Sequence, residues 1–158
     1  MLDWFVVNLV CPCLGTVAFA VLFHVPNRFY VSCAAIGTWG WLIYCALLKP
    51  TSPAIASFAA SLTVVLISRI LTVRMKCPIT MFVIPGIFPL IPGASVYYMA
   101  YDLVISETRE AGQSGFLAVK IAFGIVFGIV SAVSIPREVF SGDYWRARRR
   151  KKNKDDWY

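Results

Sequence analysis

Long uncharged stretches divide the chain into apolar segments separated by short polar links. Four stretches contain no Asp, Glu, Lys or Arg: 4–23, 29–48, 50–68 and 77–101. A fifth, 113–135, is interrupted only by Lys120. Each approaches the roughly 20 residues that a helix needs to cross a bilayer, and backbone groups in lipid must find partners within their own segment. The pattern predicts an all-α membrane protein with about five transmembrane helices.

Composition supports this class. The 158 residues are 59% hydrophobic and 15% charged, with a mean hydropathy of +0.71, and this balance excludes an ordinary soluble domain. The first segment resembles a signal peptide with a cleavage site at 18–20. However, its leader carries Asp3 and no basic residue, so we expect a retained helix. We predict a transmembrane domain over residues 1–136 and a basic tail over 137–158.

The basic residues predict the orientation of the chain. If five segments cross, one side receives Arg28, the basic residues of 69–76 and the tail, which holds eight of the fifteen Lys and Arg residues. The opposite links receive only Lys49 and Arg109. The positive-inside rule therefore places the C-terminus in the cytoplasm and the N-terminus outside. We expect the tail to rest on anionic membrane lipid. We do not expect nucleic acid as a partner, because the charge of the tail is the only feature that favours it.

The fourth segment contains the stretch PGIFPLIPG, with three prolines and two glycines in nine positions. Each proline lacks an N–H, so the carbonyls of Met81, Pro85 and Phe88 lose their helical partners. The preceding residues are disfavoured in the helical region, so 84–92 is not expected to form a regular α-helix. The segment either crosses as two half-helices or dips in and returns. Crossing is favoured, because it puts both basic regions on one side.

A broken helix at membrane depth is typical of transporter substrate sites. Amides near Gly93 would open the second half-helix and receive a carboxylate, with the Ser95 hydroxyl adding a donor. The predicted substrate-binding residues are those of the motif and the short helix after it: Pro85, Gly86, Pro89, Pro92, Gly93, Ser95, Tyr97 and Tyr98. The alternatives are a structural kink and, for the tyrosines, an interfacial aromatic belt.

Other chemistry finds little support in the sequence. No His or carboxylate lies at metal-ligand spacing beside the five cysteines, which are expected to pack between helices. Catalytic and cofactor motifs are absent, so we predict no enzyme, no metal and no cofactor. The GxxxG at Gly124 and Gly128 indicates either packing within the chain or contact with another subunit. Arg69, Asp102 and Lys120 are interpreted as side chains near helix ends that reach toward the interface.

The segment VIPGIFPLIPGASVYY, residues 83–98, resembles the signature of the threonine/serine exporter family. The resemblance is to the small membrane component of that family, which corresponds to the C-terminal half of full-length exporters. It extends over residues 1–135, since LFHVPNR and GTWGW are similar to the family's first cytoplasmic link and its glycine/tryptophan pattern.

This resemblance implies export of threonine and serine by proton-coupled antiport across a bacterial plasma (inner) membrane, together with a larger partner subunit. Some two-component members are linked instead to dicarboxylates such as succinate. A homo-oligomer and a non-transporting assembly or regulatory subunit remain as alternatives. Because the segments carry so little charge, a proton relay would have to come from a partner.

Overall fold

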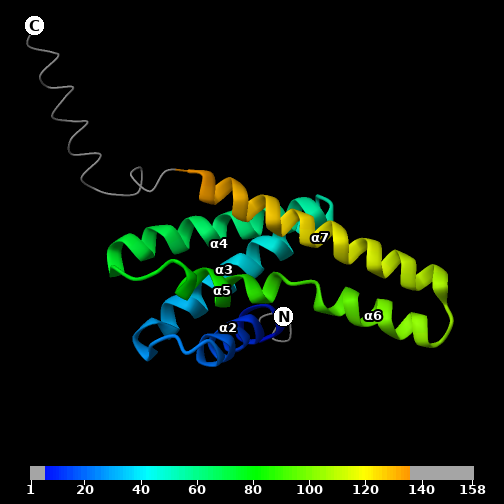
Figure 1. The fold of residues 1–158 in the computed structure, drawn as a ribbon, viewed down its shortest axis with the longest axis horizontal. Helices are drawn as coiled ribbons and strands as arrows, with labels where there is room; N and C mark the ends of the chain where they lie inside the picture. The colour runs from blue at the N-terminus through cyan, green and yellow to red at the C-terminus, as the bar shows by residue number, and fades with distance from the viewer. Residues whose placement is uncertain (1–5, 136–158) are drawn as a thin grey trace, which may run out of the picture.

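The computed structural model describes residues 6–135, and every regular element in this range is helical. Figure 1 shows the arrangement. In chain order the elements are η1 (Val6–Val10), α2 (Cys11–Leu22), η2 (Asn27–Phe29), α3 (Tyr30–Leu48), α4 (Pro53–Met75), α5 (Thr80–Ile87), η3 (Phe88–Leu90), α6 (Gly93–Val104) and α7 (Thr108–Ser134). The all-α prediction is confirmed for this range, and the predicted tail, 137–158, lies outside the described residues.

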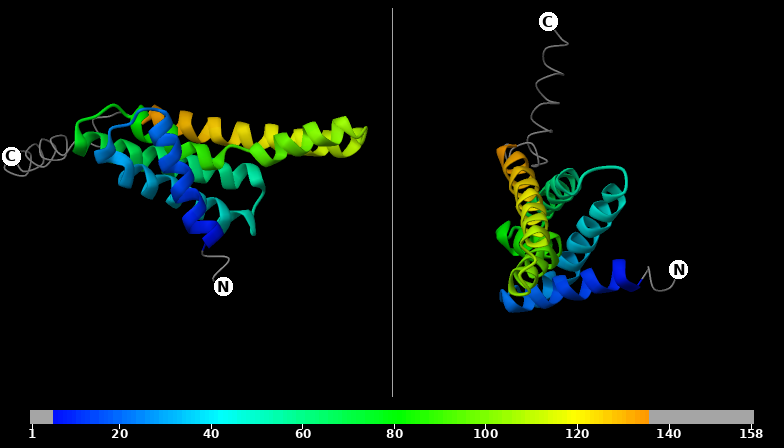
Figure 2. Two further views of the ribbon diagram at one scale, coloured as in Figure 1. Left: turned by 90° about the horizontal axis from the view of Figure 1, so that it is seen from below. Right: turned by 90° about the vertical axis from the view of Figure 1, so that its right-hand side faces the viewer.

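Three helical stretches are long and apolar enough to cross a membrane: Asn27–Leu48, Pro53–Met75 and Thr108–Ser134. The stretches Thr80–Leu90 and Gly93–Val104 form a pair bent by 46°, which adds a fourth candidate span. The first predicted crossing falls on Val6–Leu22, which is shorter. In both views of Figure 2, α2 crosses the other helices steeply instead of running beside them. The membrane class is supported, and the count of five crossings stays a prediction.

Small residues bring α4 and α7 together along most of α4. A Cβ added at Gly124 would meet the carbonyl oxygen of Ala54, and one added at Gly128 would lie 2.6 Å from the Phe58 carbonyl oxygen. The Ser61 hydroxyl donates to the Ile125 carbonyl at 3.3 Å. Residue numbers rise together along both helices, so the two helices run parallel. The GxxxG pair therefore serves contact within the chain, which settles the alternative left open by the sequence.

Arg69 ties the ends of α4 and α7 together. Its side chain is only 8% exposed, and it donates to the carbonyls of Ile135 and Val133, the latter at 3.0 Å. The last carbonyls of a helix lack partners within the helix, and its C-terminal end attracts a cation. The partners of Arg69 are thus carbonyls at the unpaired end of α7, which the sequence did not reveal.

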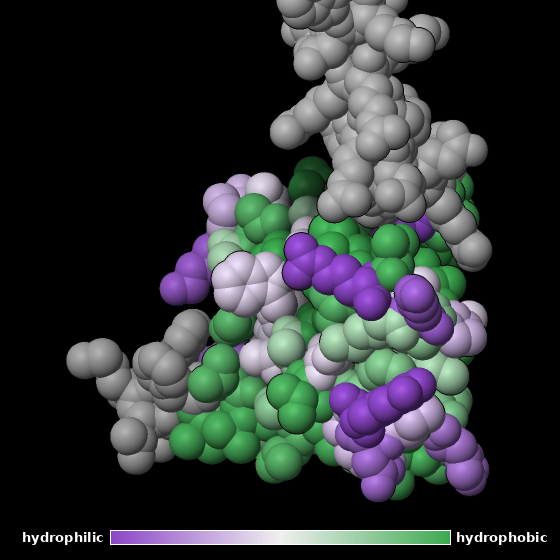
Figure 3. Space-filling view, turned by 90° about the vertical axis from the view of Figure 1, so that its left-hand side faces the viewer, coloured by the Kyte–Doolittle hydropathy of each residue, from purple (hydrophilic) through white to green (hydrophobic). Residues whose placement is uncertain are grey.

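The helices α6 and α7 form an antiparallel hairpin that extends beyond the rest of the molecule (Figure 1). No residue of α6 is buried, and a Cβ added at Gly115 of α7 would meet the sulfur of Met99. At the opposite end lie Arg28 of η2, Arg74 in the last turn of α4, and Lys76 directly after α4. Figure 3 shows hydrophilic side chains among hydrophobic ones at that end.

Candidate functional site

The proline-rich segment is more helical than its sequence predicts. The helix α5 continues through Pro85 to Ile87, and the short 3₁₀ turn η3 begins at Phe88, which still has helical angles (φ −52°, ψ −42°). The backbone becomes extended at Ile91 (φ −63°, ψ 131°) and turns at Pro92. The prediction that 84–92 is not a regular α-helix was wrong for 84–87, and the extended backbone is limited to Ile91. The break is therefore short and lies just before α6.

Two of the three carbonyls expected to be left without partners have donors. The Cys33 thiol of α3 donates to the Met81 carbonyl at 3.4 Å, which replaces the N–H that Pro85 lacks. The Ile91 amide donates to the Phe88 carbonyl at 3.2 Å. A side chain from a neighbouring helix thus allows α5 to continue past its first proline, and local sequence alone does not contain this information.

The first half of the motif is part of the packed core. Pro85 and Gly86 are both buried, and a Cβ added at Gly86 would lie 3.0 Å from the Ile36 Cγ2 atom and 3.1 Å from the Val64 Cγ1 atom. Gly86 therefore permits α5 to approach α3 and α4 closely, as expected for a glycine at a helix contact. In this conformation Pro85 and Gly86 do not line the cavity described next.

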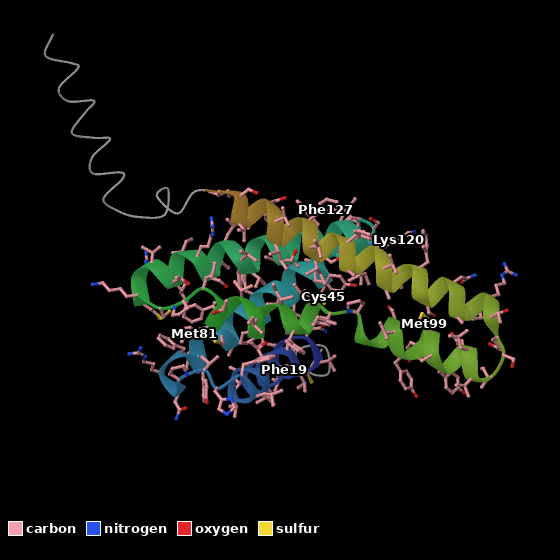
Figure 4. All side chains as sticks on the ribbon, viewed as in Figure 1. Phe19, Cys45, Met81, Met99, Lys120 and Phe127 are labelled. Carbon is pink, nitrogen blue, oxygen red and sulfur yellow. The ribbon has the colours of Figure 1, made fainter. Side chains whose placement is uncertain are left out.

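A cavity of about 300 Å³ lies where the break meets α2 and α3. Its lining comes from η1, α2, α3 and the break: Val7, Cys11, Pro12, Gly15, Phe19, Trp41, Phe88 and Pro89. The Phe19 and Phe88 rings stack with centroids 3.6 Å apart, which fixes the break against α2. Of the eight predicted site residues, Pro89 lines this cavity. Figure 4 labels Phe19 on α2 and Cys45 on α3.

A polar contact beside the cavity was missed in the sequence. The Asn8 side-chain oxygen accepts hydrogen bonds from the Trp41 indole N–H at 3.3 Å and the Cys45 thiol at 3.4 Å. Asn8 lies in the π-helix η1, next to Val7 of the cavity lining. Such π-helical turns are often found at functional sites, and polar side chains at membrane depth often mark substrate paths. The available signal was a lone Asn in an uncharged segment.

The second half of the motif lies at the start of α6, which is open. The Gly93 amide donates to the Ile91 carbonyl at 2.7 Å, and the first helical hydrogen bond runs from Val96 to Pro92. The amides of Ala94 and Ser95 therefore belong to the first turn of α6. The N–H groups of a first turn have no hydrogen-bond acceptor within their own helix. Gly93 has no positive φ, and an added Cβ would meet no atom within 4 Å.

Tyr97 and Tyr98 point away from the packed part of the molecule. Their side chains are 64% and 57% exposed, and the Tyr97 ring lies 5.6 Å from the Tyr98 ring and 6.4 Å from the Tyr101 ring. Neither tyrosine lines the cavity beside the break. An exposed aromatic cluster of this kind is typical of a membrane interface. The structure thus separates the predicted residues into a packed group, a cavity residue and an open group.

The cysteines and acidic residues of the described range do not form a metal site. All five cysteines are free thiols, and among residues 6–135 no cluster of three or more His, Cys, Asp or Glu side chains is placed to hold a metal ion. Cys33 is fully buried and Cys77, in the α4–α5 link, packs against the same core. Burial raises the pKa of the Cys77 thiol. These thiols therefore fill space between elements.

Comparison with known proteins gives the family. A family model described as "Threonine/Serine exporter, ThrE" matches residues 8–135, which is nearly all of the described range. No curated protein sequence and no solved structure matches the chain. The matched family consists of transporters, so the chain is a membrane transport protein and not an enzyme. With four-fifths of its length matched, the chain belongs to the threonine/serine exporter family.

Proposed function

We propose that the chain is a subunit of an exporter for threonine and serine, and that the break between α5 and α6 lies on the substrate path. The observation that carries this proposal is the position of the break. Phe88 and Pro89 line a cavity between α2 and α3, and the open first turn of α6 follows directly. Broken helices next to cavities are a recurrent form of transporter substrate site.

The contacts support a crossing of the fourth segment over a re-entrant dip. The Cys33–Met81 contact joins the start of α3 to the start of α5, and Arg69 joins the last turns of α4 to the end of α7. Because α4 and α7 run parallel, the chain between them must return to the side where α4 began. The bent pair α5–α6 makes this return. The basic 69–76 region then lies on the side of the C-terminus, which we place in the cytoplasm.

The substrate chemistry follows from the break. The amides of Ala94 and Ser95, at the positive end of the α6 dipole, would receive the carboxylate of an amino acid. The described lining of the cavity contains no Lys, Arg or His. A second carboxylate, as in succinate, would therefore lack a cationic partner there. We favour threonine and serine over dicarboxylates on this ground, with Pro89, Pro92 and Gly93 forming the path.

Coupling to protons would require groups from outside the described cavity. Asp102 and Lys120 lie on the α6–α7 hairpin, and Arg69 is occupied at the end of α7. None of the three lines the cavity. We therefore propose that a larger partner subunit of the same family supplies the proton relay in a bacterial plasma membrane. A homo-oligomer is the alternative arrangement.

A second candidate function is a non-transporting assembly or regulatory subunit. The burial of Pro85 and Gly86 in the core favours it, because these two residues contribute packing and no cavity surface. In this case the whole motif would be a packing device, and the basic tail would carry the interaction surface.

Counterflow in liposomes tests the proposed function. The chain is reconstituted alone and with a candidate larger partner, and uptake of labelled threonine, serine and succinate is measured. We expect threonine and serine counterflow with the partner, and little succinate counterflow. Flux by the chain alone would indicate a homo-oligomer. Absence of flux in every combination, from protein shown to be folded, would contradict the exporter and favour the regulatory subunit.

A further inference from the structure

A second cavity lies away from the break, in a groove between the start of α4 and the middle of α7. Its volume is about 490 Å³. Ala54, Ile55 and Phe58 of α4 form one wall, and Phe123 and Phe127 of α7 form the other. Both phenylalanines are 60% exposed, so the groove opens to the outside of the molecule. In a membrane protein this outside is the lipid, and the groove is a surface shaped to hold an apolar chain.

One cation lies at the end of this otherwise apolar groove. Lys120 belongs to the lining, and its ammonium lies 4.3 Å from the centre of the Phe116 ring, one turn nearer the start of α7. Within the described residues, the Lys120 ammonium contacts the Phe116 ring, and no carboxylate is paired with this ammonium. An ammonium over an aromatic face keeps its charge available to an anion.

The position of Lys120 differs from the sequence-based expectation. The last helix was expected to begin near residue 113, with Lys120 close to its start, but α7 begins at Thr108. The polar residues just before 113 therefore belong to α7, whose first half packs against α6, with Met99 against Gly115. Lys120 is therefore well inside α7, and its side chain extends toward the helix start, as long cationic side chains do when they reach for an interface.

The length of the groove matches one lipid leaflet. Its lining extends along α7 from Lys120 to Ser131, eleven residues apart. At about 1.5 Å per residue this is roughly 16 Å, close to half of the ~30 Å hydrocarbon core. Figure 4 shows Lys120 and Phe127 along this stretch of α7. A cation at one end and a leaflet-long apolar groove behind it have the dimensions of one phospholipid molecule.

We propose that this groove is a binding site for one anionic phospholipid. The phosphate lies at the Lys120 ammonium, and an acyl chain lies between Phe58 of α4 and the Phe123 and Phe127 rings of α7. With the C-terminus of α7 in the cytoplasm, the phosphate end of the groove faces the outer side of the membrane. A net negative headgroup is preferred, because the described lining of the groove offers one positive charge and no carboxylate to balance it.

Native mass spectrometry of the full chain tests the site. The protein in detergent is titrated with dioleoyl phosphatidylglycerol or dioleoyl phosphatidylcholine, and lipid adducts are counted. We expect Lys120→Gln to lower the phosphatidylglycerol adducts by about fivefold, the effect of one basic residue. The matched control is Lys76→Gln, an exposed lysine at the far end of α4, which should leave them unchanged. The basic tail is present in all variants and cancels in the comparison.

Two further measurements separate a lipid site from other occupants. Ser131→Phe fills the far end of the groove and should lower adducts of both lipids, while water-soluble glycerol 3-phosphate should not compete. Equal losses in Lys120→Gln and Lys76→Gln, no effect of Ser131→Phe, or competition by glycerol phosphate would each overturn the proposal. The proposal would also be overturned if Lys120→Gln changed the protein from dimer to monomer and left the number of lipid adducts unchanged. In that case the groove would hold a second copy of this chain. Circular dichroism establishes that each variant is folded.

Discussion

Two glycines of α7 lie in opposite surroundings. Gly128 is buried where α7 crosses α4, and an added Cβ would collide with Ser61 and the Phe58 carbonyl. Gly112 lies on the same helix, is exposed, and has no atom within 4 Å of an added Cβ. The two positions therefore separate the requirement for close helix packing from the general effect of glycine in a helix.

Gly128→Ala should destabilise the protein by about 1–3 kcal/mol, because the methyl group must push two helix backbones apart. Gly112→Ala should be neutral or stabilising by up to about 1 kcal/mol, since alanine is the better helix former. Denaturant unfolding of both variants in detergent, followed by circular dichroism, measures the difference. Equal unfolding midpoints for the two variants would show that α4 and α7 do not pack at Gly128.

Residue-level roles were only partly readable from the sequence. The small residues at 124 and 128 indicated a helix contact, but the partner helix is defined only by the fold. Arg69 was expected to reach an interface, whereas it bonds to carbonyls at the end of α7, more than sixty positions later. A charged side chain forms hydrogen bonds with unpaired carbonyls that lie close in space. When these carbonyls are far away in the sequence, the residues around the charged side chain do not indicate the partner.

The sequence predicted helices well where a long apolar stretch alone determines the element. Asn27–Leu48 and Pro53–Met75 fall close to the predicted apolar stretches. The break was placed in the right segment, but its extent was overestimated because the Cys33 thiol compensates for Pro85. The polar start of α7 was also missed, since its helix depends on packing against α6. Local rules thus located the interruption, and tertiary contacts set its boundaries.

Reporter fusions test whether the bent pair crosses the membrane. Alkaline phosphatase fused after Ser106, in the α6–α7 link, should be active, because the proposed crossing places this link outside. Green fluorescent protein fused after Ile135 should fluoresce, because the proposed orientation places the end of α7 in the cytoplasm. An inactive phosphatase at Ser106 together with a dark fusion at Ile135 would indicate a re-entrant dip. The fluorescent fusion at Met75 is the control, since both arrangements place it in the cytoplasm.

At the scale of the whole molecule, a packed body and a projecting hairpin differ in burial. The body contains the buried half of the motif, the cavity and the Asn8 contact. The hairpin of α6 and the first half of α7 contains the open helix start and the exposed tyrosines. The break joins these two parts, so motion of α6 against the body would open or close the proposed substrate path beside Gly93. Such rocking around a broken helix is a common form of alternating access.

The substrate path at the break is tested most directly by comparing threonine counterflow in the Gly93→Ala and Gly112→Ala variants. Neither methyl group meets an atom within 4 Å, so both variants should fold and assemble as the unmodified chain does. If the start of α6 receives the substrate, Gly93→Ala should lower counterflow about tenfold, equivalent to ~1.4 kcal/mol of interaction, and Gly112→Ala should retain it. Equal counterflow in the two variants, with folding and assembly intact, would contradict a substrate path at the break.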